Sequence, residues 1–177
     1  MKDISIRELA GLVYEQLKKH GIDAVLTGGS CVTVFSKNKY QSLDLDFVTS
    51  AVESKPKEIL AAMKELGFAR KPEGFFEHPK CPYVVEFIPP PLAVGSEPVK
   101  QVDLIKTKKG SFKSLSPTDC VKDRLAAFYF WDDLQSLEQA KLVSRAQKID
   151  MKEVRRWSIN ERQLPKFNIF VEQLKKK

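Results

Sequence analysis

A glycine turn followed by an acidic strand is the most informative pattern in this sequence. Residues 23–26 form a short apolar run, expected to be a buried strand, and Gly28-Gly29-Ser30 follows it directly. Residues 31–35 are expected to form a short helix, and residues 42–49 then alternate between apolar and polar side chains, which is the period of a β-strand. This order of strand, glycine turn, short helix and acidic strand predicts an α+β front half.

The acidic strand carries two carboxylates on one side. Alternation places Leu43, Leu45 and Phe47 on one face and Asp44, Asp46 and Val48 on the other. Two carboxylates so close repel each other, and hard oxygen ligands of this kind suit Mg²⁺ or Mn²⁺ together with substrate phosphates. The alternative is that Asp44 and Asp46 are simply the solvent face of the strand.

The glycine turn supplies a complementary function. Glycines let backbone N–H groups approach an anion closely, and a helix beginning there favours negative charge. Gly28 and Gly29 are therefore expected to grip the phosphates of a nucleotide, with the Ser30 hydroxyl as a further donor.

The remaining pattern predicts two regions. Helices are expected over residues 4–19, ended by Gly21, and over 55–66; strands are expected at 75–76, 83–88 and 102–105, with Gly110 in the turn after the last. From Ser116 and Pro117, an N-cap and first helical residue, the chain is expected to form three or four helices with breaks near 131–133, 148–150 and 158–160. We therefore expect an α+β core over residues 1–115 and a helical region over 116–177 packed on it.

Net charge, cysteine spacing and the length of apolar runs limit which partners, metal sites and locations are expected for this chain. Thirty Lys+Arg against 23 Asp+Glu give a formal net charge of +7, which favours polyanionic partners such as nucleotides or RNA, although solubility alone explains such a charge equally well. The three cysteines lack any CxxC spacing, which argues against a disulfide framework and a cysteine zinc site. Since no apolar run approaches the ~20 residues that span a bilayer, we expect no membrane association and a cytoplasmic location.

The segments LTGGS and LDLDF together resemble the signature of the nucleotidyltransferase superfamily, the fold of DNA polymerase beta. The resemblance implies a mixed β-sheet flanked by helices, an NTP substrate, and Mg²⁺ or Mn²⁺ held by Asp44 and Asp46. It also implies a third carboxylate on a later strand, which is Glu86 in YVVEFI or Asp103 in QVDLI, with Glu86 preferred because its strand is longer and more apolar.

A more particular resemblance is to the toxin-type nucleotidyltransferases of abortive-infection and toxin–antitoxin systems and their uncharacterised relatives. These carry, in a helical back half, a lysine followed by an aspartate, which here are Lys122 and either Asp133 or Asp132. The resemblance implies that Lys122 contacts nucleotide phosphates and that the aspartate helps in proton transfer or orients the acceptor. The chain departs from the toxin pattern at Trp131, where those proteins usually carry an arginine.

The function implied is transfer of a nucleoside monophosphate to an RNA such as tRNA, a protein or a small molecule, with an antitoxin-like protein as a further partner. The alternatives are a non-catalytic module that binds nucleotide or RNA, and a purely structural domain. Locally, residues 122–124 also fit a solvated helix face, and Trp131 and Trp157 are expected to pack between helices. A basic set in the C-terminal region fits either an RNA-facing strip or ordinary solubility: Lys141, Arg145, Lys148, Lys152, Arg155, Arg156 and Arg162.

Overall fold

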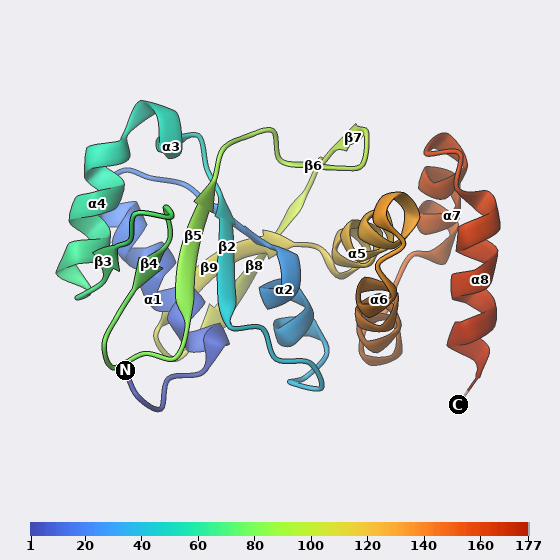
Figure 1. Cartoon of the computed structure of the whole chain (residues 1–177), viewed down its shortest axis with the longest axis horizontal. Coiled ribbons are helices and arrows are strands. Elements are labelled where there is room, and N and C mark those ends of the chain that lie inside the picture. The colour runs from blue at the N-terminus through green and yellow to red at the C-terminus, as the bar shows by residue number, and fades with distance from the viewer. Residues whose placement is uncertain (177) are drawn as a thin grey trace.

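The chain folds into a mixed sheet with its covering helices on one side and a group of helices on the other (Figure 1). This computed structural model describes residues 1–176. The N-terminus lies at the sheet end and the C-terminus at the helical end. Within the described residues, the helices are all too short or too polar to cross a membrane.

Seven strands form the sheet, in the order β3-β4-β5-β2-β1-β9-β8. The pairs β1–β9 and β2–β5 are parallel, and the other neighbours are antiparallel. A separate hairpin of two short strands, β6 and β7, lies between the sheet and the helices (Figure 1). The strands are β1 (Val25–Thr27), β2 (Asp44–Val48), β3 (Ala69–Arg70), β4 (Phe76–Glu77), β5 (Val84–Ile88), β6 (Ala93–Val94), β7 (Glu97–Pro98), β8 (Val102–Thr107) and β9 (Gly110–Leu115).

The predicted α+β class with a helical C-terminal region is confirmed. Four helices accompany the sheet: α1 (Ile6–Lys19), α2 (Gly28–Phe35), α3 (Ala51–Ser54) and α4 (Pro56–Glu65). Four more follow it: α5 (Pro117–Trp131), α6 (Leu134–Ala146), α7 (Met151–Asn160) and α8 (Leu164–Lys175). Helix α2 lies between the sheet and the pair α5 and α6, so it contacts both parts of the chain (Figure 1).

Local signals explain the helix ends. Ser5 and Glu8 form a capping box at the start of α1, and Gly21, with φ +66°, follows its end as predicted. Ser116 caps α5 by accepting a hydrogen bond from the Asp119 backbone N–H, and Pro117 is the first helical residue.

Three local expectations were wrong. Strand β9 was not predicted, because its residues do not alternate clearly between apolar and polar side chains. It nevertheless pairs with both β1 and β8 in the sheet. The break expected at 158–160 falls instead at 161–163, since α7 continues to Asn160 and Arg162 turns the chain with φ +59°. Leu43 precedes β2 and is 61% exposed, whereas Leu45 and Phe47 are fully buried as expected.

Candidate active site

The glycine turn opens helix α2 directly after β1. Gly28 is the first helical residue, and its φ of +66° is one that glycine adopts far more readily than residues with a Cβ. The first backbone N–H groups of any helix lack partners within it, and among residues 1–176 no side chain caps this end. Backbone donors at the start of α2 are therefore available to an anion.

Ser30 does not contribute its hydroxyl to that opening. Its side chain is fully buried, and Oγ donates to the Thr27 carbonyl at 2.8 Å. The turn therefore offers backbone N–H groups, while Ser30 fixes the junction between β1 and α2.

The two aspartates of β2 share the side of the sheet that faces this turn. Asp46 pairs with Thr27 in the β1–β2 register, and its Oδ2 lies so close to Gly28 that a Cβ there would overlap it. Asp44 is exposed and Asp46 half-buried, whereas Leu45 and Phe47 face the core. The predicted juxtaposition of the carboxylates and the glycine turn is therefore present.

Glu86 joins this pair, and Asp103 does not. Glu86 on β5 is the register partner of Asp46 across a parallel strand pair, and its side chain is exposed. Asp103 lies on β8, which is separated from β2 by β1 and β9, or about 14 Å at ~4.8 Å per strand. The structure thus brings Asp44, Asp46 and Glu86 together on adjacent strands.

The electrostatics of Asp46 follow from this crowding. Burial, reinforced by the charges of Glu86 and Asp44, raises the pKa of Asp46 to about 6. Arg124 on α5 opposes that rise, and Asp123 adds to it. Asp46 therefore lies among carboxylates whose charge the Arg124 guanidinium partly offsets.

A complete metal cage is not preformed. Across residues 1–176, no three His, Cys, Asp or Glu side chains converge closely enough to enclose a metal ion. Metal binding by Asp44, Asp46 and Glu86 stays a prediction.

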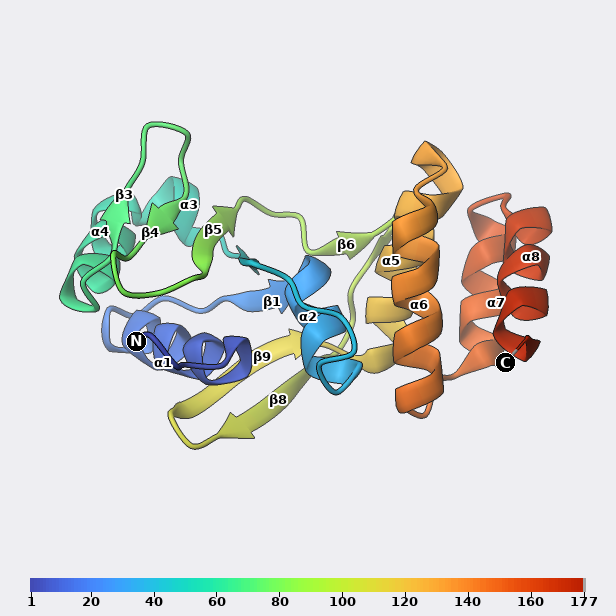
Figure 2. The same cartoon turned by 60° about the horizontal axis from the view of Figure 1, so that its bottom comes forward.

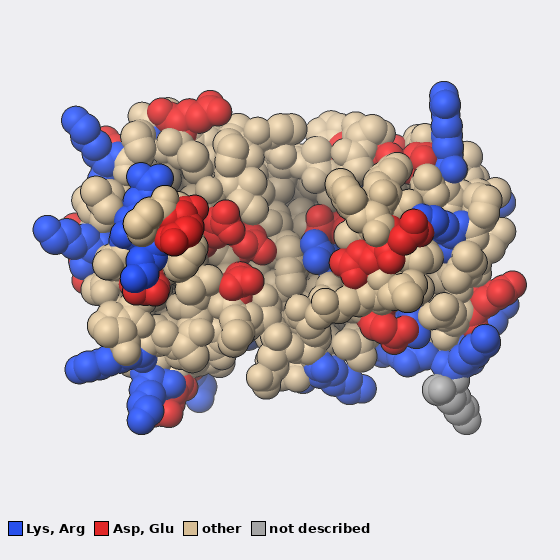
Figure 3. Space-filling view, viewed as in Figure 1, with Lys and Arg blue, Asp and Glu red and all other residues tan. Residues whose placement is uncertain are grey.

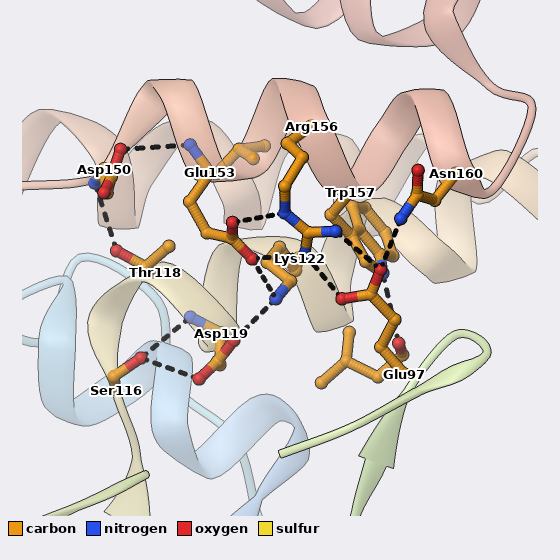
Figure 4. Close-up of polar contacts among 12 residues, drawn as sticks. Glu97, Ser116, Thr118, Asp119, Lys122, Asp150, Glu153, Arg156, Trp157 and Asn160 are labelled. Atoms are coloured by element: carbon orange, nitrogen blue, oxygen red, sulfur yellow. Dashed lines mark hydrogen bonds and ion pairs between the residues drawn. The ribbon is translucent and has the colours of Figure 1, made fainter. Parts of the chain in front are cut away.

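Lys122 lies elsewhere on α5. Its Nζ is 2.9 Å from Asp119 Oδ1 and 3.3 Å from Glu153 Oε1, and it sits 5.8 Å from the centre of the Trp157 ring (Figure 4). Together with Asp103 and Arg156 it lines a cavity of about 420 Å³ between the β7–β8 region and α5 and α7. Lys122 is thus held within the chain, and its predicted contact with nucleotide phosphates stays a prediction.

Arg124 is the α5 cation that acts on Asp46, a role that the sequence pattern did not indicate. Successive helical residues are ~100° apart around the helix axis. Arg124 comes two residues after Lys122, so the two side chains leave α5 on nearly opposite faces. Its guanidinium binds Asp123 Oδ2 at 2.5 and 3.0 Å and Gln139 Oε1 at 3.4 Å, and only 19% of its side chain is exposed. Residues 122–124 therefore do not form the solvated helix face that also fitted the sequence. The spacing of Lys122 and Arg124 along the helix was the sequence signal that these two cations lie on different faces.

Asp133 and Asp132 mark the corner between α5 and α6. Asp133 is the N-cap of α6, where it accepts hydrogen bonds from the Gln135 and Ser136 backbones and from the Ser136 hydroxyl. The Ser136 hydroxyl, with the backbone donors and Arg124, holds the pKa of Asp133 below its usual value. Asp132 adopts φ +54° and its Oδ1 lies 2.7 Å from Lys166 Nζ. Both carboxylates therefore have structural partners, and their proposed role in proton transfer stays a prediction.

Of the two tryptophans expected to pack between helices, the structure buries only one. Trp157 is fully buried, as expected, but Trp131 is 76% exposed and does not pack between helices. Several residues of the basic set bind the chain itself: Lys141 binds Glu138, Arg145 the Lys176 carbonyl, and Arg156 both Glu97 and Glu153.

Known proteins resemble this chain in structure. No family model matches the sequence, and no curated protein is similar enough to be matched. A nucleotidyltransferase-like antigenic protein from Paracoccidioides brasiliensis superposes with a TM-score of 0.55 at 12% identity, over 80% of this chain and 77% of the other. The antibiotic-resistance factor ANT(2'')-Ia superposes with a TM-score of 0.54 at 13% identity, over 98% of this chain and 96% of the other. The chain has the nucleotidyltransferase fold.

A second structure of ANT(2'')-Ia, in complex with adenylyl-2''-tobramycin, agrees with this assignment. It gives a TM-score of 0.50 at 11% identity, over 92% of this chain and 94% of the other. Identities this low establish the nucleotidyltransferase fold alone, and one fold can host several reactions.

Proposed function

We propose that this chain is a metal-dependent nucleotidyltransferase that transfers a nucleoside monophosphate from an NTP to an acceptor. The observation that carries the proposal is the position of the Asp46 carboxylate, which lies against Gly28 at the uncapped start of α2 and beside Asp44 and Glu86. A phosphate-binding helix start and a cluster of carboxylates in contact with it are the two parts that nucleotidyl transfer requires.

The donor would bind through its triphosphate at the start of α2. Backbone N–H groups of Gly28, Gly29 and Ser30 would donate to phosphate oxygens, and the positive end of the helix favours their charge. Arg124 on α5 lies near enough to Asp46 to lower its pKa, and it would supply a cation on the helical side. The chain therefore offers donors to the phosphates from both parts of the fold.

The carboxylates fit a hard divalent cation. Asp44, Asp46 and Glu86 are oxygen ligands, and the charges of Glu86 and Asp44 add to the larger effect of burial in raising the pKa of Asp46. When bound there, Mg²⁺ or Mn²⁺ would neutralise charge on the phosphates and polarise them towards attack.

The reaction balances without a further reactant. An acceptor hydroxyl attacks the α-phosphorus, the new oxygen–phosphorus bond forms, and the bond from that phosphorus to the bridging oxygen breaks to release pyrophosphate. The hydroxyl proton must leave, and Glu86, which is exposed and is the register partner of Asp46, would accept it. The acceptor remains an RNA, a protein or a small molecule in this proposal.

Label transfer tests the proposal. The protein is incubated with each of four α-phosphate-labelled NTPs and Mg²⁺ or Mn²⁺, in the presence of total RNA or a cell lysate. We expect label in an acceptor with the wild-type chain and with the control Asp103→Asn, and a loss of about 100-fold or more with Asp44→Asn/Asp46→Asn. Undiminished transfer by the double variant would exclude this site, and NTP binding without product would instead support a non-catalytic binding module.

A further inference from the structure

A loop separates the two parts of the candidate active site along the chain. Helix α2 carries the glycine turn at its start, β2 carries Asp44 at its start, and residues 36–43 connect the end of α2 to β2. Figure 2 shows this connection returning alongside α2 before β2 begins. The contacts between this loop and α2 therefore set the position of Asp44 relative to the glycine turn.

Thr33 joins the loop to the glycine turn. It lies one helical turn after Gly29 on α2, and its hydroxyl donates to the Gly29 carbonyl at 3.3 Å. The same Thr33 oxygen accepts the Ser42 backbone N–H at 2.9 Å. Thr33 is 3% exposed and Ser42 8%, so water has little access to these hydrogen bonds. One buried hydroxyl thus bonds to both the turn and the loop.

Ser42 continues the connection to Asp44. Its hydroxyl donates to the Asp44 carbonyl at 3.1 Å and accepts the Asp44 backbone N–H at 3.2 Å. The loop also packs on the turn, because a Cβ at Gly29 would lie 3.1 Å from Ser42 Oγ and 3.5 Å from Tyr40 Cε1. Asp44 is itself exposed, so its place relative to the turn depends on these contacts of its backbone.

The carboxylates of this site face a hollow. Figure 3 shows acidic side chains over the β5 and β2 part of the sheet, beside a hollow between the sheet and the helices. Asp44 and Glu86 are the exposed carboxylates of these two strands. A divalent ion in nucleotidyl transfer bridges carboxylate and phosphate oxygens, so the spacing between Asp44 and the turn decides whether one ion reaches both.

We propose that Thr33 and Ser42 are positioning residues of this site: they hold Asp44 at a fixed distance from the glycine turn, so that one metal ion contacts both Asp44 and the bound phosphates. Neither side chain touches the substrate, because each acts through the backbone of Gly29 or Asp44. Such sites require their ligands to be placed within about 0.5 Å. This inference rests on the proposed function, since it names what fixes the geometry of that reaction.

The coupling between metal and nucleotide binding measures this spacing. The probes are the α,β-methylene analogues of ATP, GTP, CTP and UTP, which cannot be cleaved at the α-phosphorus. Each is titrated into the full chain by calorimetry, once with saturating Mn²⁺ and once with EDTA. The ratio of the two dissociation constants is the coupling, and we expect a ratio of about 30 or more for at least one analogue.

Variants of the two residues locate the coupling. Thr33→Val keeps the shape of the side chain but removes the shared hydroxyl, and we expect it to lower the ratio by about tenfold. Without any metal, the Ser42 amide should exchange with solvent about tenfold faster in this variant. Thr33→Ser keeps the hydroxyl and should restore both values. Ser42→Ala loses the bonds to Asp44 and should lower the ratio as Thr33→Val does.

Thr49, directly after the far end of β2, supplies the matched control. It is 4% exposed, its hydroxyl donates to the Asp23 carbonyl at 2.6 Å, and the same oxygen accepts the Ala51 N–H at 3.1 Å. Thr49→Val therefore removes the same kind of hydroxyl away from the glycine turn. Both valine variants should melt below the wild type, because each leaves a buried N–H without its partner, but Thr49→Val should keep the wild-type ratio.

The outcomes separate this inference from the proposed function. An unchanged ratio in Thr33→Val, an equal fall in Thr49→Val, or no recovery in Thr33→Ser would each overturn the inference, while coupling in the wild type would leave the transferase proposal standing. If Thr33→Val does not fold, an unchanged ratio in Ser42→Ala overturns the inference in its place. A wild-type ratio near 1 for every analogue would refute the shared metal site on which both proposals depend.

Discussion

Asp46 occupies a position that opposes its own ionisation. Burial and the charges of Glu86 and Asp44 raise its pKa to about 6, above the value of about 3.9 in an unfolded chain. Between these two values the folded state binds more protons than the unfolded state, so the free energy of unfolding falls as pH rises through this window. At neutral pH the ionised Asp46 therefore destabilises the fold.

Replacing Asp46 by the uncharged Asn removes that penalty. We expect Asp46→Asn to unfold with a free energy larger than the wild type by up to about 3 kcal/mol at pH 8, at ~1.4 kcal/mol per pKa unit, and to show no gain at pH 4. Urea unfolding at the two pH values measures this difference. The exposed Asp103→Asn is the matched control, and a gain of equal size at both pH values would contradict the electrostatic explanation.

Two features favour glycine at position 28: its backbone has a positive φ, and a Cβ there would overlap Asp46. We expect Gly28→Ala to lower the free energy of unfolding by more than about 2 kcal/mol, because φ +66° strains a residue with a Cβ and that Cβ would also overlap Asp46 Oδ2. Thermal and urea unfolding measure the loss. Gly21→Ala is the control, since its φ is also +66° and the atom nearest to the new Cβ is the flexible Lys55 Nζ at 3.3 Å. Equal losses would show that contact with Asp46 contributes nothing.

At the scale of residues, the sequence predicted the site on its sheet side. Alternation along β2 was enough to place Asp44 and Asp46 together, and the length of its apolar strand favoured Glu86, which the register with Asp46 supports. The burial of Ser30 could not be predicted from the sequence of the turn. Its hydroxyl donates to the Thr27 carbonyl, which comes within reach only when β1 and α2 have folded against each other.

Among the elements, α5 shows how one helix divides its charges between two environments. Lys122 turns towards α7 and binds Asp119 and Glu153, while Arg124 turns towards the sheet and acts on Asp46. The sequence places both cations on one helix, but the facing elements decide which one reaches the site. Those elements come from distant parts of the chain, so local pattern could not select between them.

Loss of Lys122 and loss of Arg124 from α5 should affect different properties: the first the free energy of unfolding, the second the pKa of Asp46. Lys122→Met takes the ion-pair partner away from the mostly buried Asp119, whereas Glu153 keeps Arg156. We expect this change to lower the free energy of unfolding by about 2 kcal/mol or more without moving the titration of Asp46. Arg124→Met removes the cation that lowers the Asp46 pKa, and we expect that pKa to rise above about 6. Carbon-13 NMR of the aspartate carboxylates against pH measures both titrations.

The control for Lys122 is a similarly spaced pair on the surface. Lys18 binds Glu15 at 3.2 Å, with 51% of the lysine and 35% of the glutamate side chain exposed, so Lys18→Met should change the free energy of unfolding by less than about 1 kcal/mol. If Lys122→Met were equally mild and instead moved the Asp46 titration, Lys122 would belong to the site after all.

Over the whole molecule, the sheet part and the helical part share one core. Cys31 and Val32 on α2 are fully buried between the sheet and the later helices, and Gln147 Nε2 donates to the Phe35 carbonyl at 2.8 Å. The buried Trp157 indole donates to the Val94 carbonyl of β6 at 3.1 Å, which joins α7 to the hairpin. The division into residues 1–115 and 116–177 stays a prediction about the chain, and these contacts argue that neither part is stable alone.

The shared core predicts a single cooperative unfolding transition. In Trp131→Phe, Trp157 alone reports the helical part, and hydrogen exchange of β1 and β2 amides reports the sheet. We expect the two probes to give the same free energy of unfolding, and a chain ending at residue 115 to remain unfolded because α2 would expose Cys31 and Val32. A folded 1–115 fragment, or helices that unfold at lower denaturant than the sheet, would show two independent domains. The candidate active site would then lie between separable parts, with Asp46 on one and Arg124 on the other, and its geometry would depend on how the two parts dock.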